Sequence, residues 1–294
     1  MVFRKTDVYI LLGTRKGAFI LQSDSRRSKW KMKGPFLENS PVFHMAFDKR
    51  DGKTIYAAVN SGHFGPTIQR TKNFGRSWEN SLNPPRFEGS GLKVEMVWHV
   101  EPGHSNEPDV VYSGVAPAAL FRSHDGGNSW KLNEGLNSHP IRPEWQPGAG
   151  GLCLHSIVID PSNQRRIYLG ISAVGVLKSE DEGESWVLKN RNVRADFLPT
   201  KYPEFGQCVH KLVMDAENTE YLYQQNHCGV YRSEDGAENW SEISKGLPSG
   251  FGFPMASHPH KSRTFFVVPE EGDFFRVAAN REFVVYGTSN GGKS

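Results

Sequence analysis

The chain has 294 residues, of which 37% are hydrophobic and 23% are charged, and its formal net charge is +3. This balance is typical of a globular protein, and the small, dispersed charge gives no electrostatic basis for a nucleic-acid or membrane partner. No apolar run of about 18 residues could span a bilayer. Three cysteines without Cys-x-x-Cys spacing, and a start without a visible secretory leader, favour a cytoplasmic setting.

In chain order, the first strand-like runs lie at residues 8–12, 17–21 and 30–32. They correspond to strands two, three and four of a unit whose first strand is missing. Later units show all four strands, for example at residues 94–100, 110–114, 119–122 and 130–132, and again at 152–159, 166–170, 175–178 and 186–189. Four short strands in a unit of roughly 50 residues predict an all-β fold, a β-propeller of four-stranded antiparallel blades.

Tryptophans reveal the repeat. Five of them recur at intervals of 48, 52, 56 and 54 residues, and the last four end a shared octet, Ser/Thr-x-Asp/Asn-x-Gly-x-Ser-Trp. In the last of these, Ala237 replaces the glycine and Asn239 the serine. A degenerate copy at residues 23–30 has lost the acid and the glycine, and a further copy at residues 288–294 stops before its tryptophan.

The residue types of the octet suit a tight turn between the third and fourth strands. Asp or Asn accepts hydrogen bonds from nearby backbone N–H groups, glycine permits positive φ, and the leading hydroxyl ties the turn. We expect the tryptophan to cover the apolar side of the outer strand. These residues are therefore assigned to folding: Thr71, Asn73, Gly75, Trp78, Ser123, Asp125, Gly127, Trp130, Ser179, Asp181, Gly183, Trp186, Ser233, Asp235 and Trp240.

The octets resemble the Asp-box, or BNR, repeats of sialidases, sortilin-type receptors, xyloglucan-cleaving glycosidases and photosystem assembly factors. The closest likeness is to uncharacterised bacterial Asp-box proteins labelled glycosyl hydrolase or sialidase-like. The resemblance covers almost the whole chain. Because the box is a folding element in all these families, it implies architecture more firmly than activity.

We expect a single propeller domain over residues 1–294, with blades at 7–36, 40–85, 92–136, 151–191, 207–247 and 250–294. The last blade is incomplete, since the chain ends inside its octet. Propellers commonly close by pairing the two ends of the chain, so we expect a truncated form of a parent protein with six or seven blades.

Two connections between blades are long, residues 133–151 and 190–207. In the propellers that the chain resembles, ligands sit over the channel on the face where such loops emerge. Each long loop leads into a strand that starts with a histidine, and aligning Asp160 with Asp215 makes His155 and His210 equivalent. A shorter loop adds His227, and its counterpart near the start of the chain holds Asn60, Ser61 and His63. The candidate ligand-binding residues are His155, His210, His227, Asn226, Trp145, Arg142 and Arg194.

Two of these candidates suggest particular ligands. Trp145 lies outside the octets in a Pro- and Gly-rich loop, where an indole could stack on a sugar ring or a partner. Histidines with an acid would suit a divalent transition ion, but no ligand spacing of a known type occurs. We therefore predict no metal and no cofactor.

For function, the sequence favours a binding or scaffolding module that recognises a glycan or polypeptide through its top-face loops. The alternative is a glycoside hydrolase. A sialidase is expected to show an Arg-Ile-Pro motif, which is absent, and a xyloglucanase-like enzyme needs two carboxylates across a cleft. The candidate catalytic residues are Glu144, Asp196, Glu204 and Tyr202.

Overall fold

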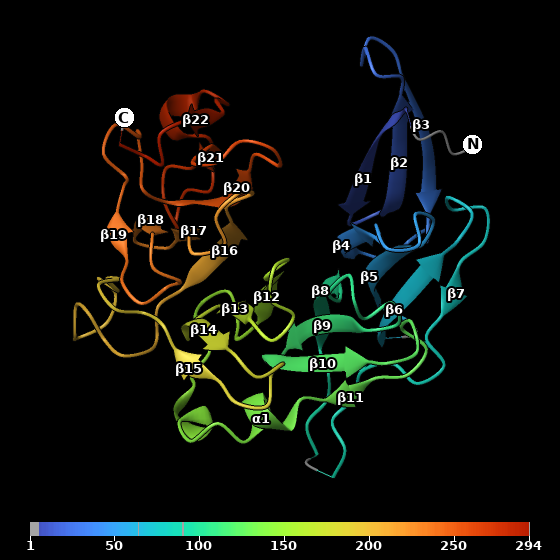
Figure 1. The fold of residues 1–294 in the computed structure, drawn as a ribbon, viewed down its shortest axis with the longest axis horizontal. Helices are drawn as coiled ribbons and strands as arrows, with labels where there is room; N and C mark the ends of the chain where they lie inside the picture. The colour runs from blue at the N-terminus through green and yellow to red at the C-terminus, as the bar shows by residue number, and fades with distance from the viewer. Residues whose placement is uncertain (1–5, 64, 90, 294) are drawn as a thin grey trace. The chain divides into compact units, whose positions relative to one another are not determined.

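The computed structural model describes residues 6–63, 65–89 and 91–293. The prediction of an all-β propeller is confirmed: the chain forms six antiparallel sheets, and the few helices are single short turns (Figure 1). Among the described residues, no helix has the length and apolar character needed to cross a membrane. The chain divides into two compact units, Met1–Asn133 and Glu134–Ser294, each with three sheets.

The first unit holds sheets one to three. Sheet one consists of β1 (Val8–Thr14), β2 (Gly17–Ser23) and β3 (Trp30–Phe36). Sheet two consists of β4 (Val42–Phe47), β5 (Ile55–Ser61), β6 (Gly65–Thr71) and β7 (Glu79–Asn80). Sheet three consists of β8 (Met96–Pro102), β9 (Val111–Ala116), β10 (Ala119–Ser123) and β11 (Lys131–Leu132).

The second unit begins with α1 (Glu134–Asn137) and the 3₁₀ turn η1 (Arg142–Glu144) and holds sheets four to six. Sheet four consists of β12 (Leu154–Ile159), β13 (Ile167–Ile171), β14 (Gly175–Ser179) and β15 (Val187–Leu188). Sheet five consists of β16 (Val209–Met214), β17 (Leu222–Asn226), β18 (Gly229–Ser233) and β19 (Ser241–Glu242). Sheet six consists of β20 (Gly252–Ser257), β21 (Phe265–Pro269) and β22 (Tyr286–Thr288), with the 3₁₀ turn η2 (Ala279–Arg281) before β22.

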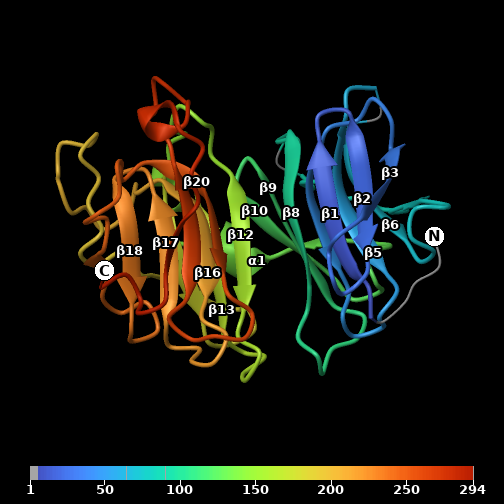
Figure 2. The same cartoon turned by 90° about the horizontal axis from the view of Figure 1, so that it is seen from above.

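Within each unit the core lies between successive sheets, which pack face to face (Figure 2). In the first unit, Tyr56 of sheet two meets Val97 and Phe121 of sheet three. In the second unit, Tyr168 of sheet four meets Leu212 and Tyr231 of sheet five. Buried apolar strands facing a neighbouring sheet are what a propeller blade requires, because a single four-stranded sheet cannot bury both of its faces alone.

The tryptophans take part in this packing between sheets, which extends the expectation that they cover the outer strand of their own sheet. Trp130 lies in the same buried cluster as Tyr56 of the preceding sheet, and its Nε1 donates to Ser81 Oγ at 3.1 Å. Trp240 does the same against sheet four, where its Nε1 donates to the carbonyl of Lys189 at 2.7 Å. Trp30 is the exception, since 38% of its surface is exposed.

The first strand of sheets two to six is interrupted by a bulge near its start. In β12, Leu154 pairs with Ile171 and Ser156 with Gly170, so His155 is the extra residue. In β16, Val209 pairs with Asn226 and Lys211 with Gln225, so His210 is the extra residue. The corresponding residues of β4 and β8 are Phe43 and Trp98, and in β20 the two residues Phe253 and Pro254 oppose one residue of β21. A bulge bends the strand and re-aims the side chain of the extra residue.

The octets fold into one recurring turn. In the turn at Asp181, Oδ1 accepts hydrogen bonds from Ser179 Oγ at 2.7 Å and from the Ser185 backbone N–H at 2.9 Å, and Oδ2 accepts from Ser185 Oγ. The hydroxyl of Ser179 in turn accepts from the Gly183 N–H at 2.8 Å. The turns at Asn73, Asp125, Asp235 and Asn290 repeat this arrangement. The final residue of the last octet, Ser294, lies outside the described residues.

Two octets show what the consensus residues contribute. The degenerate copy forms a different turn, in which Ser23 Oγ donates to the Lys29 carbonyl at 2.7 Å, because the third position holds Ser25 in place of a carboxylate or amide. In the fifth sheet, Ala237 takes the place of the glycine at φ 71° and is completely buried. The turn therefore tolerates a methyl group in the left-handed region but not the loss of the carboxylate or amide acceptor.

We predict that Asp181→Ala lowers the free energy of unfolding by on the order of 1 to 3 kcal/mol, because it leaves turn donors without their acceptor. Asp181→Asn is the matched control, since Asn73 and Asn290 hold this position in other turns and keep the main contacts. Urea unfolding measures both variants. Equal stability of Asp181→Ala and wild type would contradict the folding role.

The same pair predicts a pH effect. Burial raises the pKa of Asp181, but hydrogen bonds from Ser185 and Ser179 outweigh it and lower the pKa to about 2. A lowered folded-state pKa contributes stability above the unfolded value, and that stability is lost as pH falls towards 2. The stability difference between wild type and Asp181→Asn should therefore shrink between pH 4 and pH 2.

Candidate functional site

The two bulge histidines of the second unit make equivalent contacts to the next sheet. His155 Nε2 lies 2.7 Å from the carbonyl oxygen of Val209, and His210 Nδ1 lies 2.7 Å from the carbonyl oxygen of Gly252. Because a carbonyl only accepts, each of these ring nitrogens carries the proton. The predicted equivalence of His155 and His210 thus corresponds to a shared contact between neighbouring sheets.

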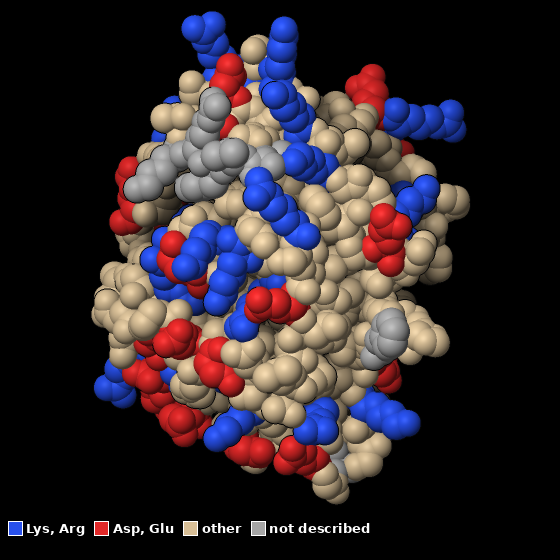
Figure 3. Space-filling view, turned by 90° about the vertical axis from the view of Figure 1, so that its right-hand side faces the viewer, with Lys and Arg blue, Asp and Glu red and all other residues tan. Residues whose placement is uncertain are grey.

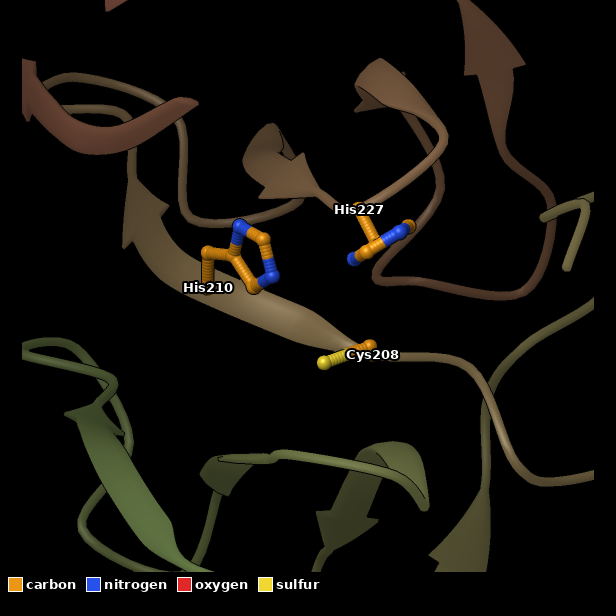
Figure 4. Close-up of side chains that lie close together, drawn as sticks. All are labelled: Cys208, His210 and His227. Carbon is orange, nitrogen blue, oxygen red and sulfur yellow. The ribbon is translucent and has the colours of Figure 1, made fainter. Parts of the chain in front are cut away.

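The two imidazoles differ in their second nitrogen. His155 Nδ1 lies 3.1 Å from Ser156 Oγ, so both of its ring nitrogens have partners within the chain. His210 instead presents its Nε2, the nitrogen that carries the lone pair, to the space beside His227 and Cys208 (Figure 4). Burial lowers the pKa of both histidines to about 4, so both are neutral at physiological pH.

Rings surround His227, which follows β17. His210 lies edge-on to it at a centroid distance of 5.6 Å, Phe251 at 5.2 Å and Phe197 at 5.0 Å. Phe253 stacks on His210 at 4.4 Å, with an angle of 13° between the rings. We call these five rings and Cys208 the His227 cluster.

Cys208 adds a thiol to the cluster. The ligand atoms that Cys208, His210 and His227 offer all lie within 4.8 Å of one another, and the three side chains converge in Figure 4. Burial raises the pKa of the Cys208 thiol, and the Ser172 hydroxyl lies 3.2 Å from its sulfur. Thiol and imidazole groups at this spacing are able to coordinate a transition-metal ion.

Two charged residues of the loop after β21 border the cluster, and a second loop approaches Cys228, the residue after His227. Asp273 Oδ2 lies 3.7 Å from His227 Nε2, and Arg276 lies over the ring of Phe253 at 5.1 Å. From the other loop, the Asp196 N–H approaches the sulfur of Cys228 at 3.4 Å. Burial lowers the pKa of His227, while the charge of Asp273 acts to raise it.

The first long loop is closed over its own aromatic residue. Trp145 is 5% exposed, and the guanidinium of Arg142 lies over its ring at 4.7 Å. The His139 ring lies on the same residue at 6.2 Å. Trp145 therefore acts as a loop anchor, which leaves little of its indole for the sugar stacking considered from sequence. Glu144, at the end of η1, is exposed beside it.

The second long loop is held by contacts within the chain. Arg194 donates to both oxygens of Glu242, at 2.9 and 3.0 Å, and forms an ion pair with Asp196. Glu204 contributes its main-chain carbonyl, which accepts from Asn190 Nδ2 at 3.0 Å. Tyr202 is 57% exposed at the loop surface. Phe197, the neighbour of Asp196 in sequence, is the residue of this loop that contacts the His227 ring.

The remaining predicted polar residues shape hairpins. Asn226 is completely buried, where its Oδ1 accepts from the Cys228 N–H at 3.2 Å and its Nδ2 donates to Gln224 Oε1 at 3.2 Å. In the first unit, Asn60 bonds both backbone groups of Val97, at 2.8 and 3.0 Å. In the same hairpin as Asn60, the His63 N–H donates to Ser61 Oγ at 3.3 Å.

Sequence reasoning missed several members and neighbours of this site: Cys208, Phe197, Phe251, Phe253, Asp273 and Arg276. One signal was available, because Cys208 stands only two residues before His210 in the sequence. Phe253 could also have been predicted, because it occupies the position of His210 in the repeat of the sixth sheet. Asp273 and Arg276 carry no repeat signal.

No protein-family model matches the chain. Among curated proteins, it is similar to the xyloglucanase Xgh74A of Acetivibrio thermocellus, with 25% identity over 255 residues, 76% of this chain and 28% of that protein. It is also similar to an oligoxyloglucan-reducing end-specific xyloglucanase of Emericella nidulans, with 28% identity over 79 residues, 26% of this chain and 9% of that protein. The chain thus spans less than a third of the length of these relatives.

Among solved structures, the chain resembles a GH74 enzyme of Niastella koreensis with a TM-score of 0.66, at 17% identity, over 99% of this chain and 43% of that one. It also resembles the GH74 xyloglucanase of Xanthomonas campestris with a TM-score of 0.54, at 15% identity, over 96% of this chain and 50% of that one. At these identities the likeness concerns the fold.

We predict that His155 makes stability depend on pH between about 4 and 6.5, because burial lowers its folded-state pKa from 6.5 to about 4. A lowered histidine pKa means that the unfolded chain binds the proton first, so stability is lost as pH falls through this range. His155→Gln should lose less stability than wild type between pH 6.5 and pH 4, as measured by urea unfolding at each pH. His124→Gln, at an exposed histidine, is the control and should follow wild type.

Proposed function

We propose that this chain binds a neutral β-glucan of the xyloglucan class at the loops around His227 and takes part in its hydrolysis. One observation supports this most directly: two loops from different parts of the second unit reach His227, one through the ring of Phe197 and the other through the carboxylate of Asp273. Asp196-Phe197 comes from the loop before β16, and Asp273-Phe274 from the loop after β21. In each loop an aspartate is adjacent in sequence to an exposed phenylalanine. Aromatic rings suit the binding of a sugar chain, and a pair of carboxyl groups suits its cleavage.

The aromatic members supply stacking surface. Phe197 is 48% exposed although its ring contacts His227, and Phe274 is 90% exposed. A phenyl ring that is partly held by the protein and partly open to solvent offers a flat apolar face to the C–H groups of a sugar ring. Tyr202, on the same loop as Phe197, is a further exposed aromatic side chain.

The carboxylates supply acid–base groups. Glycoside hydrolysis uses one carboxyl group as acid and a second as base or nucleophile. Asp273 is the carboxylate beside His227, and Asp196, on the loop that brings Phe197 to His227, forms an ion pair with Arg194. Of the four catalytic candidates proposed from sequence, we choose Asp196 as the partner of Asp273, because it is adjacent in sequence to Phe197, whose ring contacts His227.

The contacts of the arginines favour a neutral over an anionic sugar. A sialidase-type site needs arginines directed at the carboxylate of the substrate. Arg194 is engaged by Glu242 and Asp196, and Arg142 lies over Trp145. Neither guanidinium is available as a clamp without first breaking these contacts.

The similarity to xyloglucanases over 76% of the chain supports the choice of glycan. Because the chain spans 28% of that relative, glycan binding and glycan hydrolysis are separate parts of the proposal. A binding or scaffolding role, with a glycan or a polypeptide as the ligand, is the second candidate, and the exposed rings of Phe197 and Phe274 favour it.

We also infer that the octets are Asp-box repeats, as the shared turn with its acid, hydroxyl and glycine supports. A cytoplasmic location stays a prediction from sequence alone. Lys and Arg side chains lie among Asp and Glu on the face that Figure 3 shows, and this mixture supports leaving nucleic acid out of the proposal.

We predict that the chain binds xyloglucan oligosaccharides more tightly than sialyllactose in isothermal titration calorimetry. Phe197→Ala should weaken binding by about 2- to 10-fold, the range expected for loss of one stacking ring. Phe266→Ala is the matched control, because this phenylalanine of β21 is exposed to a similar degree but lies outside the two loops. Absence of binding to any neutral glucan would refute the proposal.

Hydrolysis is measured separately, by release of reducing sugar from xyloglucan. Asp273→Asn should lower the rate by on the order of 10²-fold or more while binding is kept, because an amide cannot exchange the proton. Phe266→Ala should keep the wild-type rate. Binding without turnover in wild type would assign the chain to the binding role.

A further inference from the structure

Three side chains of the His227 cluster converge without an evident reason in packing alone. Cys208 stands immediately before β16, His210 is the bulge residue of β16, and His227 follows β17. Their potential ligand atoms lie within 4.8 Å of one another, and they point into one space (Figure 4). We infer that Cys208, His210 and His227 bind a transition-metal ion of the Zn²⁺ class, a property beyond the proposed glycan function.

The orientation of His210 supports this inference. Histidines that bind metals commonly donate their other ring N–H to a carbonyl or carboxylate, which fixes the tautomer and directs the lone pair. His210 Nδ1–H donates to the Gly252 carbonyl at 2.7 Å, and this leaves Nε2 as the basic nitrogen facing Cys208 and His227.

His155 provides an internal comparison. It occupies the equivalent bulge and makes the equivalent bond to the next sheet, to Val209. Its second nitrogen, however, is paired with Ser156 Oγ at 3.1 Å, and it is not part of the group of potential ligands. The backbone contact therefore explains why a histidine suits the bulge, but it does not explain why a thiol and a second imidazole meet the basic nitrogen of His210.

The donor set indicates the class of metal. A thiolate and two imidazoles prefer Zn²⁺ and similar transition ions over Mg²⁺ or Ca²⁺, which take oxygen ligands. On binding, the Cys208 thiol releases its proton to solvent and coordinates as the thiolate. The ion and the thiolate leave one net positive charge, and the Asp273 carboxylate, 3.7 Å from His227 Nε2, lies close enough to offset it.

The distances require a small adjustment. Tetrahedral Zn²⁺ with Zn–S of about 2.3 Å and Zn–N of about 2.0–2.1 Å holds its ligand atoms about 3.3 to 3.6 Å apart. The three atoms now lie within 4.8 Å of one another, so side-chain rotations that move them by about 1 Å would bring them to that spacing. Three protein ligands leave the fourth position open to water or a ligand oxygen, as in Zn²⁺ sites that act on substrates.

Titration of the tag-free, full-length chain with Co²⁺ tests the site by absorption spectroscopy. Co²⁺ bound tetrahedrally to a thiolate shows a sulfur-to-metal charge-transfer band in the near ultraviolet and ligand-field bands in the visible. We expect saturation at about one Co²⁺ per chain, and displacement of Co²⁺ by an equal amount of Zn²⁺ with loss of both sets of bands.

Variants assign the ligands. Cys208→Ser should abolish the charge-transfer band, and His210→Gln and His227→Asn should each weaken Co²⁺ binding by at least about 10-fold. His155→Gln is the matched control for His210→Gln, and Cys153→Ser and Cys228→Ser are the controls for Cys208→Ser. All three controls should keep wild-type spectra and affinity. Circular dichroism and thermal unfolding identify any variant that fails to fold.

Two results would overturn the inference. One is the absence of a charge-transfer band in folded wild-type protein at Co²⁺ concentrations well above that of the chain. The other is a band that survives in folded Cys208→Ser but disappears in Cys153→Ser or Cys228→Ser, because the thiolate would then come from a different cysteine. Neither result depends on glycan binding, so the metal site and the proposed function fail separately.

Discussion

The second unit depends on hydrogen bonds that join the first strand of one sheet to the first strand of the next sheet. A bulge near the start of each of these strands disturbs the regular ladder, and buried backbone groups need partners. His155 and His210 supply them by donating to Val209 and Gly252 of the next sheet. Each contact joins two sheets at the end where the long loops enter. The loops therefore emerge from positions that the sheets themselves determine, and Phe197 and Asp273 reach His227 from different directions.

The same bulge position serves both structure and chemistry. In sheet four, both ring nitrogens of His155 have hydrogen-bond partners, a carbonyl and a hydroxyl, and the side chain serves only to join two sheets. In sheet five the corresponding histidine uses Nδ1 for the carbonyl of the next sheet, and its Nε2 keeps the lone pair. Cys208 and His227 then stand beside that nitrogen. Packing by Phe251 and Phe253 holds the His210 imidazole in place. These two rings therefore orient the imidazole, whereas Cys208 and His227 are the neighbours of its basic nitrogen.

Much of the fold could be predicted from sequence because the octets act locally. Each turn at Asp125, Asp181 or Asp235 is closed by residues within four positions, so residue type alone identifies it. The equivalence of His155 and His210 was also predictable, because it follows from the repeat. The site was predicted only in part, since Asp273 and Phe197 meet His227 through loops whose paths depend on contacts far apart in sequence. For Trp145, the Pro- and Gly-rich loop around it suggested that the indole could stack on a ligand. Its contacts with the rest of the loop bury it instead.

The bulge also bears on how such a chain can change over evolutionary time. The residue at the bulge is Phe43, Trp98, His155, His210 and Phe253 in turn, all flat rings held in the same backbone frame. One codon at this place exchanges a benzene, indole or imidazole ring while the strand pairing on either side is kept. Duplicated sheets thus provide parallel positions in which one copy can acquire a new role while its siblings preserve the architecture.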